Sequence, residues 1–436
     1  MLVQAESPAT LAGWLELLDH RHGAPIQLGL DRVARVLANM ADHSEAQVIT
    51  VGGTNGKGST CAMLEAILVA GGYRVGCYTS PHLLRYNERV RIDGVEVGDA
   101  RLVEAFAAVE AARDGEALTC FEHGTLAAWH VFCAEALDVI VLEVGLGGRL
   151  DAVNAIDADC AIVTSVAMDH MDYLGDTRDA IGFEKAGIFR AGRPAVCGDP
   201  QPPVALVEHA RAVGAQLWIS GRDFGFGGDR QQWGYWRYAA PAAGGALHRR
   251  GGLAYPALRG ANQLLNASAV LTALELLRER VPVSMQAVRQ GLMLVECPGR
   301  FQVLPGKPAV VLDVAHNPQA AGVLSENLSN MGFYPETWAV VGMLRDKDVE
   351  GVVARLKDRV DHWLLASTPG PRGLRAAELA ERLAAAGVAG DIHCNDTPAA
   401  AYRVARERAA EGDRIVVFGS FLSVSDVLGV IRADRH

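Results

Sequence analysis

One stretch constrains the fold of this chain more than any other. In residues 48 to 59, V-I-T-V-G-G-T-N-G-K-G-S, an apolar run of strand type breaks into a glycine-rich loop. The residues from Lys57 onward have helical apolar spacing, so the loop joins a strand to a helix N-terminus. Backbone N–H groups there can point at a polyphosphate, while the Lys57 ammonium reaches its terminal phosphates. The stretch predicts a phosphate site, with a tight structural turn as the alternative.

The loop departs from the general P-loop pattern at one position. That pattern has Ser or Thr directly after the lysine, whereas here Gly58 intervenes and the hydroxyl belongs to Ser59. We expect the following loop residues to bind a nucleotide: Thr54, Asn55, Gly56, Lys57, Gly58 and Ser59.

Size and charge exclude several classes of protein. The 436 residues predict two or three units, and 50% hydrophobic with 21% charged residues is the balance of a globular enzyme. The net charge of -10 argues against a large nucleic-acid footprint. The sequence contains no apolar run of roughly 18 residues and no basic segment before a hydrophobic stretch at its start. We therefore expect a cytoplasmic protein that binds neither nucleic acid nor membrane.

The cysteines indicate neither a disulfide framework nor a metal site. Eight are scattered through apolar runs without any C-x-x-C pair. They are Cys61, Cys77, Cys120, Cys133, Cys160, Cys197, Cys297 and Cys394. The spacing predicts reduced core residues.

Strand and helix patterns alternate after the loop. Apolar runs of strand type occupy residues 73 to 80, 137 to 145, 160 to 166 and 194 to 198. The run L-D-V-I-V-L-E-V-G is nearly continuously apolar, as in strands buried in a parallel sheet. Ligands of doubly wound sheets lie beyond the carboxyl ends of the strands. Four expected strand ends carry polar residues: Lys57 with Ser59, Ser80, Glu143, and His170.

The alternation stops and then restarts. Residues 1 to 45 have helical patterns, and residues 221 to 259 predict a small antiparallel hairpin region before a helix over 262 to 280. Beyond Pro298 and Gly299, strand patterns return at 309 to 315, 338 to 344, 362 to 367 and 414 to 420. We expect an α/β protein with an N-terminal P-loop ATPase domain built on a parallel sheet, residues 1–297. A smaller Rossmann-like α/β domain, residues 298–436, would follow.

Glu143 stands where a carboxylate could hold Mg²⁺ beside a bound triphosphate. The alternative is a charge at a strand end that faces solvent. Three glycines within residues 145 to 148, directly after the strand, favour a close approach of backbone to a ligand. Ser80 and His170 are weak signals alone, because a lone histidine is more often a packed side chain than a ligand.

Seven ordered motifs together resemble a known family. They are G-T-N-G-K-G-S, Y-T-S-P-H-L, E-V-G-L-G-G-R-L-D-A, D-H-M-D-Y-L-G, E-K-A-G-I-F, P-G-R-F-Q and D-V-A-H-N-P. In this order they resemble folylpolyglutamate synthases of the bacterial bifunctional dihydrofolate synthase type, members of the Mur ligase superfamily. The likeness runs from about residue 25 to G-S-F-L-S-V-S-D-V-L near the C-terminus. In that superfamily a glycine follows the loop lysine, as Gly58 does here.

The resemblance implies an ATP-dependent amide ligase with two Mg²⁺ sites. A substrate carboxylate would take the γ-phosphoryl group, and the amine of L-glutamate would displace phosphate from the acyl phosphate. Lys57 would stabilise the transferring group. Ser80 and Glu143 match the family's first metal site, and Glu143, His170 and Lys185 its second. Lys185 is carbamylated in the family, although the sequence alone predicts an ordinary surface-helix lysine there.

By the same resemblance, Asn266, Arg300 and Asp313 correspond to ATP contacts from the linker and the second domain. His316 and Ser420 are expected near the glutamate, with His316 among the catalytic residues. Arg300 is chemically suited to clamp phosphate, and the alternative is a linker salt bridge. Because these groups belong to both units, domain closure would complete the site.

Three segments match the family's dihydropteroate pocket, at residues 25 to 33, 119 to 122 and 150 to 152. The expected contacts are Gln27, Leu28, Thr119, Cys120, Phe121, Glu122, Leu150, Asp151 and Ala152. Phe121 can stack on a flat ring, and Asp151 can accept hydrogen bonds from pterin N–H groups. The alternative for Phe121 is a core position.

The resemblance predicts addition of L-glutamate to 7,8-dihydropteroate and to reduced folates by a monomer. A cell-wall ligase of the same superfamily is the first alternative. The L-G-G-R-L-D and P-G-R-F-Q strings weigh against it, as does the lack of a separate N-terminal uridine-nucleotide domain. The second is a P-loop ATPase that acts as a switch, which would leave D-V-A-H-N-P without a role.

Overall fold

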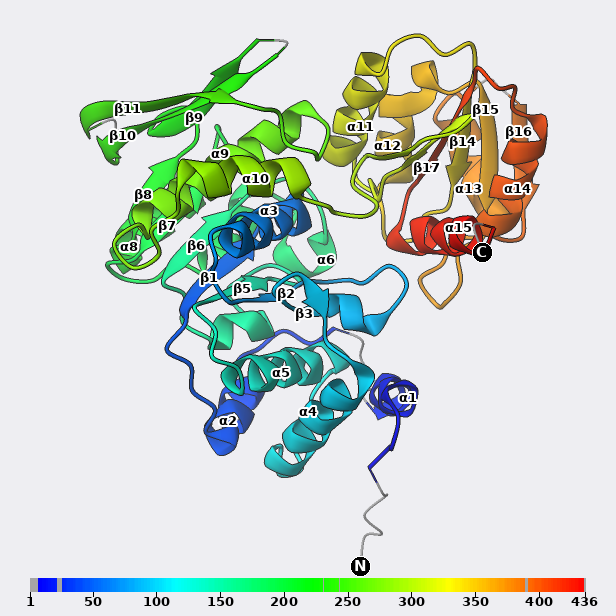
Figure 1. Cartoon of the computed structure of the whole chain (residues 1–436). Coiled ribbons are helices and arrows are strands. Elements are labelled where there is room, and N and C mark those ends of the chain that lie inside the picture. The colour runs from blue at the N-terminus through cyan, green and yellow to red at the C-terminus, as the bar shows by residue number, and fades with distance from the viewer. Residues whose placement is uncertain (1–6, 22–25, 230, 243, 389–390, 435–436) are drawn as a thin grey trace, which may run out of the picture.

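Two units built on separate sheets make up the chain (Figure 1). The computed structural model describes residues 7–21, 26–229, 231–242, 244–388 and 391–434. Expectations that fall on residues 1–6 and on Pro25 lie outside the described residues. The last helix before the expected domain boundary ends at Leu294, and the first strand after it begins at Gln302.

The first unit contains an eight-stranded sheet of order β4-β3-β2-β5-β1-β6-β7-β8. Its strands are β1 (Gln47–Gly52), β2 (Val75–Tyr78), β3 (Val90–Ile92), β4 (Val95–Glu96), β5 (Val139–Glu143), β6 (Cys160–Val163), β7 (Pro194–Cys197) and β8 (Gln216–Ile219). From β2 to β8 in this order all neighbours pair in parallel, while β3 and β4 are antiparallel. The sequence patterns missed β3 and β4, which have three and two residues, and β8, of which only two residues are buried.

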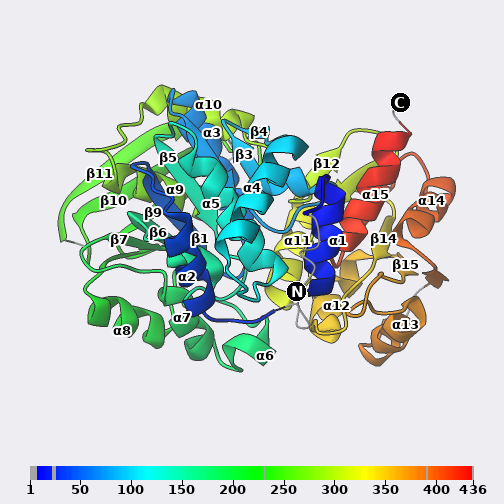
Figure 2. The ribbon, with the colours of Figure 1, turned by 90° about the horizontal axis from the view of Figure 1, so that it is seen from below.

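Alternation along the strands buries both faces of this sheet. Ile140 and Leu142 belong to one apolar cluster, whereas Val139 and Val141 belong to the other. One face is covered by helices α1 (Leu11–Arg21), α2 (Asp31–Met40), α4 (Asp99–Ala112), α5 (Cys120–Cys133), α7 (Arg178–Ala186) and α8 (Val204–Val213). Figure 2 looks onto α2, α4 and α5.

The other face is covered by α3 (Lys57–Ala70), α9 (Ala261–Leu276) and α10 (Met285–Leu294). Beside them lies an antiparallel sheet of β9 (Phe224–Gly228), β10 (Trp233–Ala240) and β11 (Gly244–Leu253). A short helix, α6 (Met171–Leu174), follows β6. No described helix is both long and apolar enough to cross a membrane.

The second unit has a six-stranded sheet of order β12-β13-β17-β14-β15-β16. Its strands are β12 (Gln302–Leu304), β13 (Ala309–Leu312), β14 (Thr337–Val341), β15 (His362–Ala366), β16 (Asp391–Asn395) and β17 (Arg414–Phe418). Its helices are α11 (Pro318–Asn330), α12 (Val349–Leu356), α13 (Ala376–Ala385), α14 (Pro398–Arg408) and α15 (Phe421–Ala433). The sequence patterns did not indicate the edge strands β12 and β16, because neither strand has a buried apolar run.

The loop after β2 reaches into the second unit. Leu83 is buried in one cluster with Val314 and Val424, and the Ser425 hydroxyl donates to the Leu83 carbonyl at 2.5 Å. The loop that carries Ser80 is therefore part of the contact between the units.

All eight cysteines are free, as expected, but not all are core residues. Cys394 is exposed, which corrects the expectation. It lies on β16, an edge strand in which no residue is fully buried.

Candidate active site

A cavity of about 690 Å³ lies between the two units. It is lined by the phosphate loop, by the ends of β2, β5 and β6, by the start of α9, and by loops of the second unit. Parallel strands place their carboxyl ends at one sheet edge, and a switch point there is the usual ligand position of such sheets. The chain therefore places its polar strand ends in one cavity.

The phosphate loop is tied to the loop after β6. Thr54 N donates to Ser165 O at 2.8 Å, and the Thr54 hydroxyl bonds to Ala167 O and accepts from Ala167 N. The Thr164 hydroxyl donates to Asn55 O at 2.7 Å. These bonds within the first unit fix the loop, so it is preorganised.

Two loop glycines are required by the backbone geometry. Gly53 has φ 136°, and a Cβ there would lie 1.9 Å from Thr164 Oγ1. Gly56 has φ 90°, and its Cβ would lie 2.7 Å from Asn266 Oδ1 on α9. A side chain at either position would both strain the backbone and fill the cradle. Lys57 Nζ donates to the carbonyl of Gly53, the first residue after β1, at 3.1 Å.

Glu143 is buried at the end of β5, with 2% of its surface exposed, so it is not the solvent-facing charge that was the alternative. One carboxylate oxygen accepts from Ser80 N at 3.1 Å. Burial raises the pKa of Glu143, although the charges of Lys57 and Arg300 act in the opposite direction. Ser80, Glu143 and the loop helix therefore meet at one point.

His170 follows β6 with φ 51°, a left-handed conformation that is uncommon for a residue with a side chain. Its N–H donates to the carboxylate of Asp169 at 2.9 Å. Burial lowers the pKa of His170 to about 4, so the ring is neutral at neutral pH and can act as a ligand.

Lys185 lies on the last turn of α7 and is 3% exposed, which corrects the sequence-based expectation of a surface lysine. Burial first, and then the charge of Lys57, lowers its pKa to about 7. The glycine loop after β5 packs closely against the backbone of this turn, because a Cβ on Gly148 would lie 3.0 Å from the Lys185 carbonyl.

Arg300 brings a cation from the second unit. A Cβ on Gly58 would lie 3.4 Å from its Nη2, and its guanidinium lies 4.8 Å from the ring centre of Phe421. Its Nη1 is buried without a hydrogen-bond partner in the described part of the chain. An orphaned buried guanidinium N–H beside a phosphate loop fits an anionic group.

Asp313, Asn266, His316 and Ser420 also line the cavity, as predicted from the motifs. Asp313 accepts from Phe301 N and from Ala315 N at 2.8 Å each. Asn266 donates to Gln263, which in turn donates to the Ser59 hydroxyl. Ser420 caps α15 by accepting from Ser423 N.

The residues expected around a pterin form a separate group beside the cavity. Gly29 N donates to Leu150 O at 3.1 Å, which joins the segments of Gln27 with Leu28 and of Leu150 with Ala152. Phe121 packs against the cavity wall, since a Cβ on Gly145 would lie 2.5 Å from its ring. Gly145 lines the cavity, so the ring lies next to the cavity wall, and it also packs against the core.

Other members of this group already have structural partners. Thr119 and Glu122 cap α5 by reciprocal hydrogen bonds, and Glu122 also pairs with Arg32 at 2.7 Å. Asp151 accepts from Leu146 N and Val153 N, and burial raises its pKa to about 6. The half-buried Cys120 is the first residue of α5.

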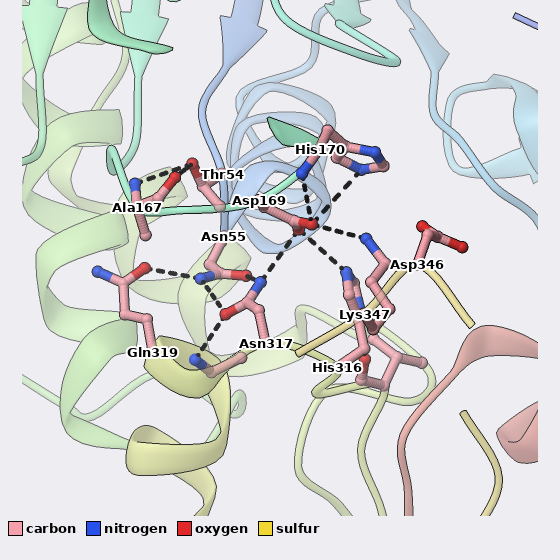
Figure 3. Close-up of polar contacts among 12 residues, drawn as sticks. Thr54, Asn55, Ala167, Asp169, His170, His316, Asn317, Gln319, Asp346 and Lys347 are labelled. Carbon is pink, nitrogen blue, oxygen red and sulfur yellow. Dashed lines mark hydrogen bonds and ion pairs between the residues drawn. The ribbon is translucent and has the colours of Figure 1, made fainter. Parts of the chain in front are cut away.

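Sequence reasoning missed a polar cluster that joins the two units (Figure 3). Asp169 pairs with Lys347 at 2.6 Å and with His316 Nε2 at 3.3 Å. Burial opposes ionisation of Asp169, but His316 and Lys347 outweigh it and the pKa is lowered. The signals were D-H-M-D after one apolar run and L-R-D-K-D after another.

The donor set fits a nucleotide phosphate and a divalent metal of Mg²⁺ type. Mg²⁺ is usually held by one or two carboxylates together with substrate phosphates and water, and Glu143 with the Ser59 and Ser80 hydroxyls offers such oxygens. No cluster of three His, Cys, Asp or Glu side chains that could hold a metal occurs in the described ranges. Further ligands must therefore come from the substrate or from other groups.

Comparison with known proteins identifies the two units. Residues 51–198 match the Mur ligase middle domain, and residues 299–421 match the glutamate ligase domain of Mur ligases. The Escherichia coli protein named dihydrofolate synthase/folylpolyglutamate synthase is 43% identical over 433 residues, 99% of this chain and 97% of the relative. The Haemophilus influenzae protein of that name is 40% identical, over 99% of each chain.

Solved structures agree with these sequence relatives. Escherichia coli FolC in complex with DHPP and ADP superposes with a TM-score of 0.92 at 41% identity, covering 99% of this chain and 100% of that one. The Yersinia pestis bifunctional enzyme complexed with AMPPNP and Mn ion gives 0.89 at 43% identity, over 98% of this chain and 99% of that one. The predicted α/β class and the predicted resemblance are both confirmed. The chain therefore belongs to the bifunctional dihydrofolate synthase/folylpolyglutamate synthases, ATP-dependent glutamate ligases built from Mur ligase domains.

Proposed function

We propose that this chain joins L-glutamate to 7,8-dihydropteroate and adds γ-linked glutamates to reduced folates, each time converting ATP to ADP and phosphate. One observation carries the proposal: a single cavity is lined by a preorganised phosphate loop from one unit and by Arg300 and His316 from the other. An acid and an amine from separate substrates can meet there beside a nucleotide.

Activation of the acid is proposed as phosphoryl transfer. A carboxylate oxygen of the acceptor attacks the γ-phosphorus, the bond to the ADP oxygen breaks, and an acyl phosphate forms. Lys57 of the first unit and Arg300 of the second unit both line the cavity, and together they would offset the charge on the transferring group. The amine of glutamate then attacks the acyl carbon, and inorganic phosphate leaves with the former carboxylate oxygen while the nitrogen loses a proton.

Two divalent sites are proposed. Ser80 with Glu143 would hold one, and Glu143, His170 and a carbamylated Lys185 the other; bound metal would neutralise phosphate charge. Carbamylation joins the neutral amine to CO₂ and releases a proton, giving a carboxylate where the chain has a cation. The buried position of Lys185, with its pKa of about 7, supports this reaction because the neutral amine is accessible at neutral pH.

The acceptor is proposed to enter beside Gly145, where Phe121 can stack on an aromatic ring. The Asp151 carboxylate retains acceptor capacity beyond its two backbone bonds. We also propose that the ligase works as a monomer in the cytoplasm, which size-exclusion chromatography with light scattering and cell fractionation would check.

The test is phosphate release from MgATP and L-glutamate with dihydropteroate or tetrahydrofolate, with products identified by mass. We expect each acceptor to gain one glutamyl unit per phosphate released. Turnover with tetrahydrofolate alone would remove the dihydrofolate synthase activity from the proposal. Phosphate release that does not require glutamate would contradict ligation altogether.

A further inference from the structure

The two units are joined at the cavity by a hydrogen-bond cluster that the proposed chemistry does not use. Asn317 is the residue that caps α11 from the second unit, and it is only 3% exposed. Its amide N–H groups donate to Asn55 Oδ1 at 3.0 Å and to Asp169 Oδ2 at 3.2 Å. Its carbonyl oxygen accepts from Asn55 Nδ2 at 3.1 Å and from Ala320 N at 3.0 Å.

These four bonds use the full capacity of the side chain. An asparagine has two amide N–H donors and two lone pairs on its oxygen, and every one of them is engaged. Only the bond from Ala320 comes from the same unit. Separation of the units would therefore break the other three, and it would also free Asn55 from Gln319, which accepts from Asn55 Nδ2 at 2.7 Å.

A buried ion pair lies beside the amides. Lys347 donates to Asp169 Oδ1 at 2.6 Å, and the two side chains are 5% and 8% exposed. Asp169 thus receives Lys347, His316 and Asn317, all from the second unit (Figure 3). A buried charge without its partner is costly unless water reaches it. The two units are therefore stable either fully closed, with the ion pair formed, or fully separated, with both charges hydrated.

The partners on the first unit belong to the nucleotide-binding half. Asn55 is a phosphate-loop residue, held by the Thr164 hydroxyl at its carbonyl, and Asp169 precedes the predicted metal ligand His170. The second unit therefore docks directly on the loop, and its position depends on that loop's conformation.

We propose that Asn317 is a positioning residue, the centre of a latch with Asn55, Asp169 and Lys347 that holds the glutamate ligase domain closed on the phosphate loop. This inference rests on the proposed function, because it assumes that closure completes the site. The latch sets the fraction of enzyme that is closed. Weakening it lowers that fraction and so lowers kcat/KM for ATP, acceptor and glutamate by one common factor.

Two substitutions separate this role from helix capping. Asn317→Asp keeps an excellent N-cap but places a second carboxylate against Asp169. Asn317→Ser also keeps a cap but is too short to reach Asn55. Thr397→Ala is the control, because Thr397 caps α14 of the same unit by accepting from Ala400 N, away from the cavity. It removes a cap without touching the latch.

We expect Asn317→Asp to lower all three kcat/KM values by about tenfold or more, and Asn317→Ser to lower them less. Small-angle scattering with MgATP and acceptor should show a more extended particle for Asn317→Asp than for the wild type, with an unchanged melting temperature. Thr397→Ala should lower the melting temperature and leave kinetics and scattering as they are.

Other outcomes overturn the latch. If Asn317→Asp has wild-type kinetics and scattering, the latch is refuted. If only the KM of one substrate rises, Asn317 is a contact for that substrate and not a latch residue. A wild type that releases no phosphate with any acceptor would count against the proposed function, and the scattering comparison would still decide the latch.

Discussion

The two units contribute to the cavity in different ways. The half on the first unit is held by its own sheet: Thr54 is fixed to Ala167, and Glu143 to Ser80. The half on the second unit reaches the cavity through contacts that cross between the units, above all those of Asn317 and Lys347. The half of the cavity on the first unit is preorganised, whereas the half on the second unit is positioned by contacts between the units. Substitutions in the two halves should therefore have different effects on kinetics and on the shape of the particle.

The largest effect should come from the preorganised half. Lys57→Met removes the loop cation, and we expect kcat to fall by about 10² to 10³ because transition-state charge loses its donor. Scattering of the complex should stay as in the wild type, since both hydrogen bonds of the Lys57 ammonium within the described residues go to the first unit, to Gly53 O and Thr54 O. The control is Lys307→Met at an exposed ion pair, which should leave kcat unchanged. A more extended particle for Lys57→Met would show that the phosphate loop also positions the second unit, which contradicts this division of roles.

Lys185→Gln should have the second-largest effect. We expect kcat to fall by about 10², because a charged group is lost at the reacting centre. The pH dependence is a sharper test. Protonation of the amine blocks carbamylation, so wild-type activity should fall as pH drops below about 7, the pKa of Lys185. Added bicarbonate should recover activity at neutral pH. Activity that ignores bicarbonate after exhaustive CO₂ removal would refute carbamylation.

Arg300→Lys tests the half of the cavity on the second unit without removing a positive charge. Lysine cannot keep both the stacking on Phe421 and the reach of the free Nη1 toward an anion. We expect KM for ATP to rise by about tenfold, the value of one hydrogen bond to a charged group. Isothermal titration with a non-hydrolysable ATP analogue would measure the same loss directly, and unchanged affinity would contradict the assignment.

Leu83→Ala tests the apolar contact between the units. Leu83 is 9% exposed among second-unit side chains, so truncation should cost about 2 to 4 kcal/mol of unfolding free energy. We expect only a few-fold loss of kcat, because the polar contacts at the cavity remain. Urea unfolding followed by tryptophan fluorescence measures the first quantity. Leu294→Ala, at an exposed leucine of the first unit, is the matched control and should leave both quantities unchanged.

His123 should affect stability and not catalysis. It is fully buried on α5, where burial lowers its pKa to about 4. Because the folded pKa lies below the unfolded value of about 6.5, its stabilisation is complete above pH 6.5 and is lost as pH falls toward 4, by up to about 3 kcal/mol. His123→Gln should flatten this pH dependence of urea unfolding while kcat at pH 8 stays unchanged. An equally steep dependence in the variant would exclude His123 as its source.

The sequence predicted the preorganised half better than the other. Lys57, Ser80, Glu143 and His170 each follow an apolar strand, so local pattern and sheet topology were enough to bring them together. Lys185 was recognisable only through its motif, because the burial of a helical lysine depends on tertiary packing and leaves no local pattern in the sequence.

The contacts between the units could not be predicted. Asp169 and Lys347 are 178 positions apart, and Asn55 and Asn317 are 262 apart. Asp, Lys and Asn are suited equally well to solvent-exposed positions and to helix caps. No periodic pattern in the sequence indicates that residues so far apart are in contact. Only the relative placement of the two sheets makes them a cluster.

An ¹⁸O label tests most sharply whether the acceptor is activated as an acyl phosphate. Acceptor labelled with ¹⁸O in its carboxylate is turned over with MgATP and L-glutamate, and the released phosphate is weighed by mass spectrometry. Activation in the cavity as an acyl phosphate predicts one ¹⁸O atom in each phosphate, because the acid oxygen leaves with phosphorus. Unlabelled phosphate released together with glutamylated product would rule out an acyl phosphate intermediate.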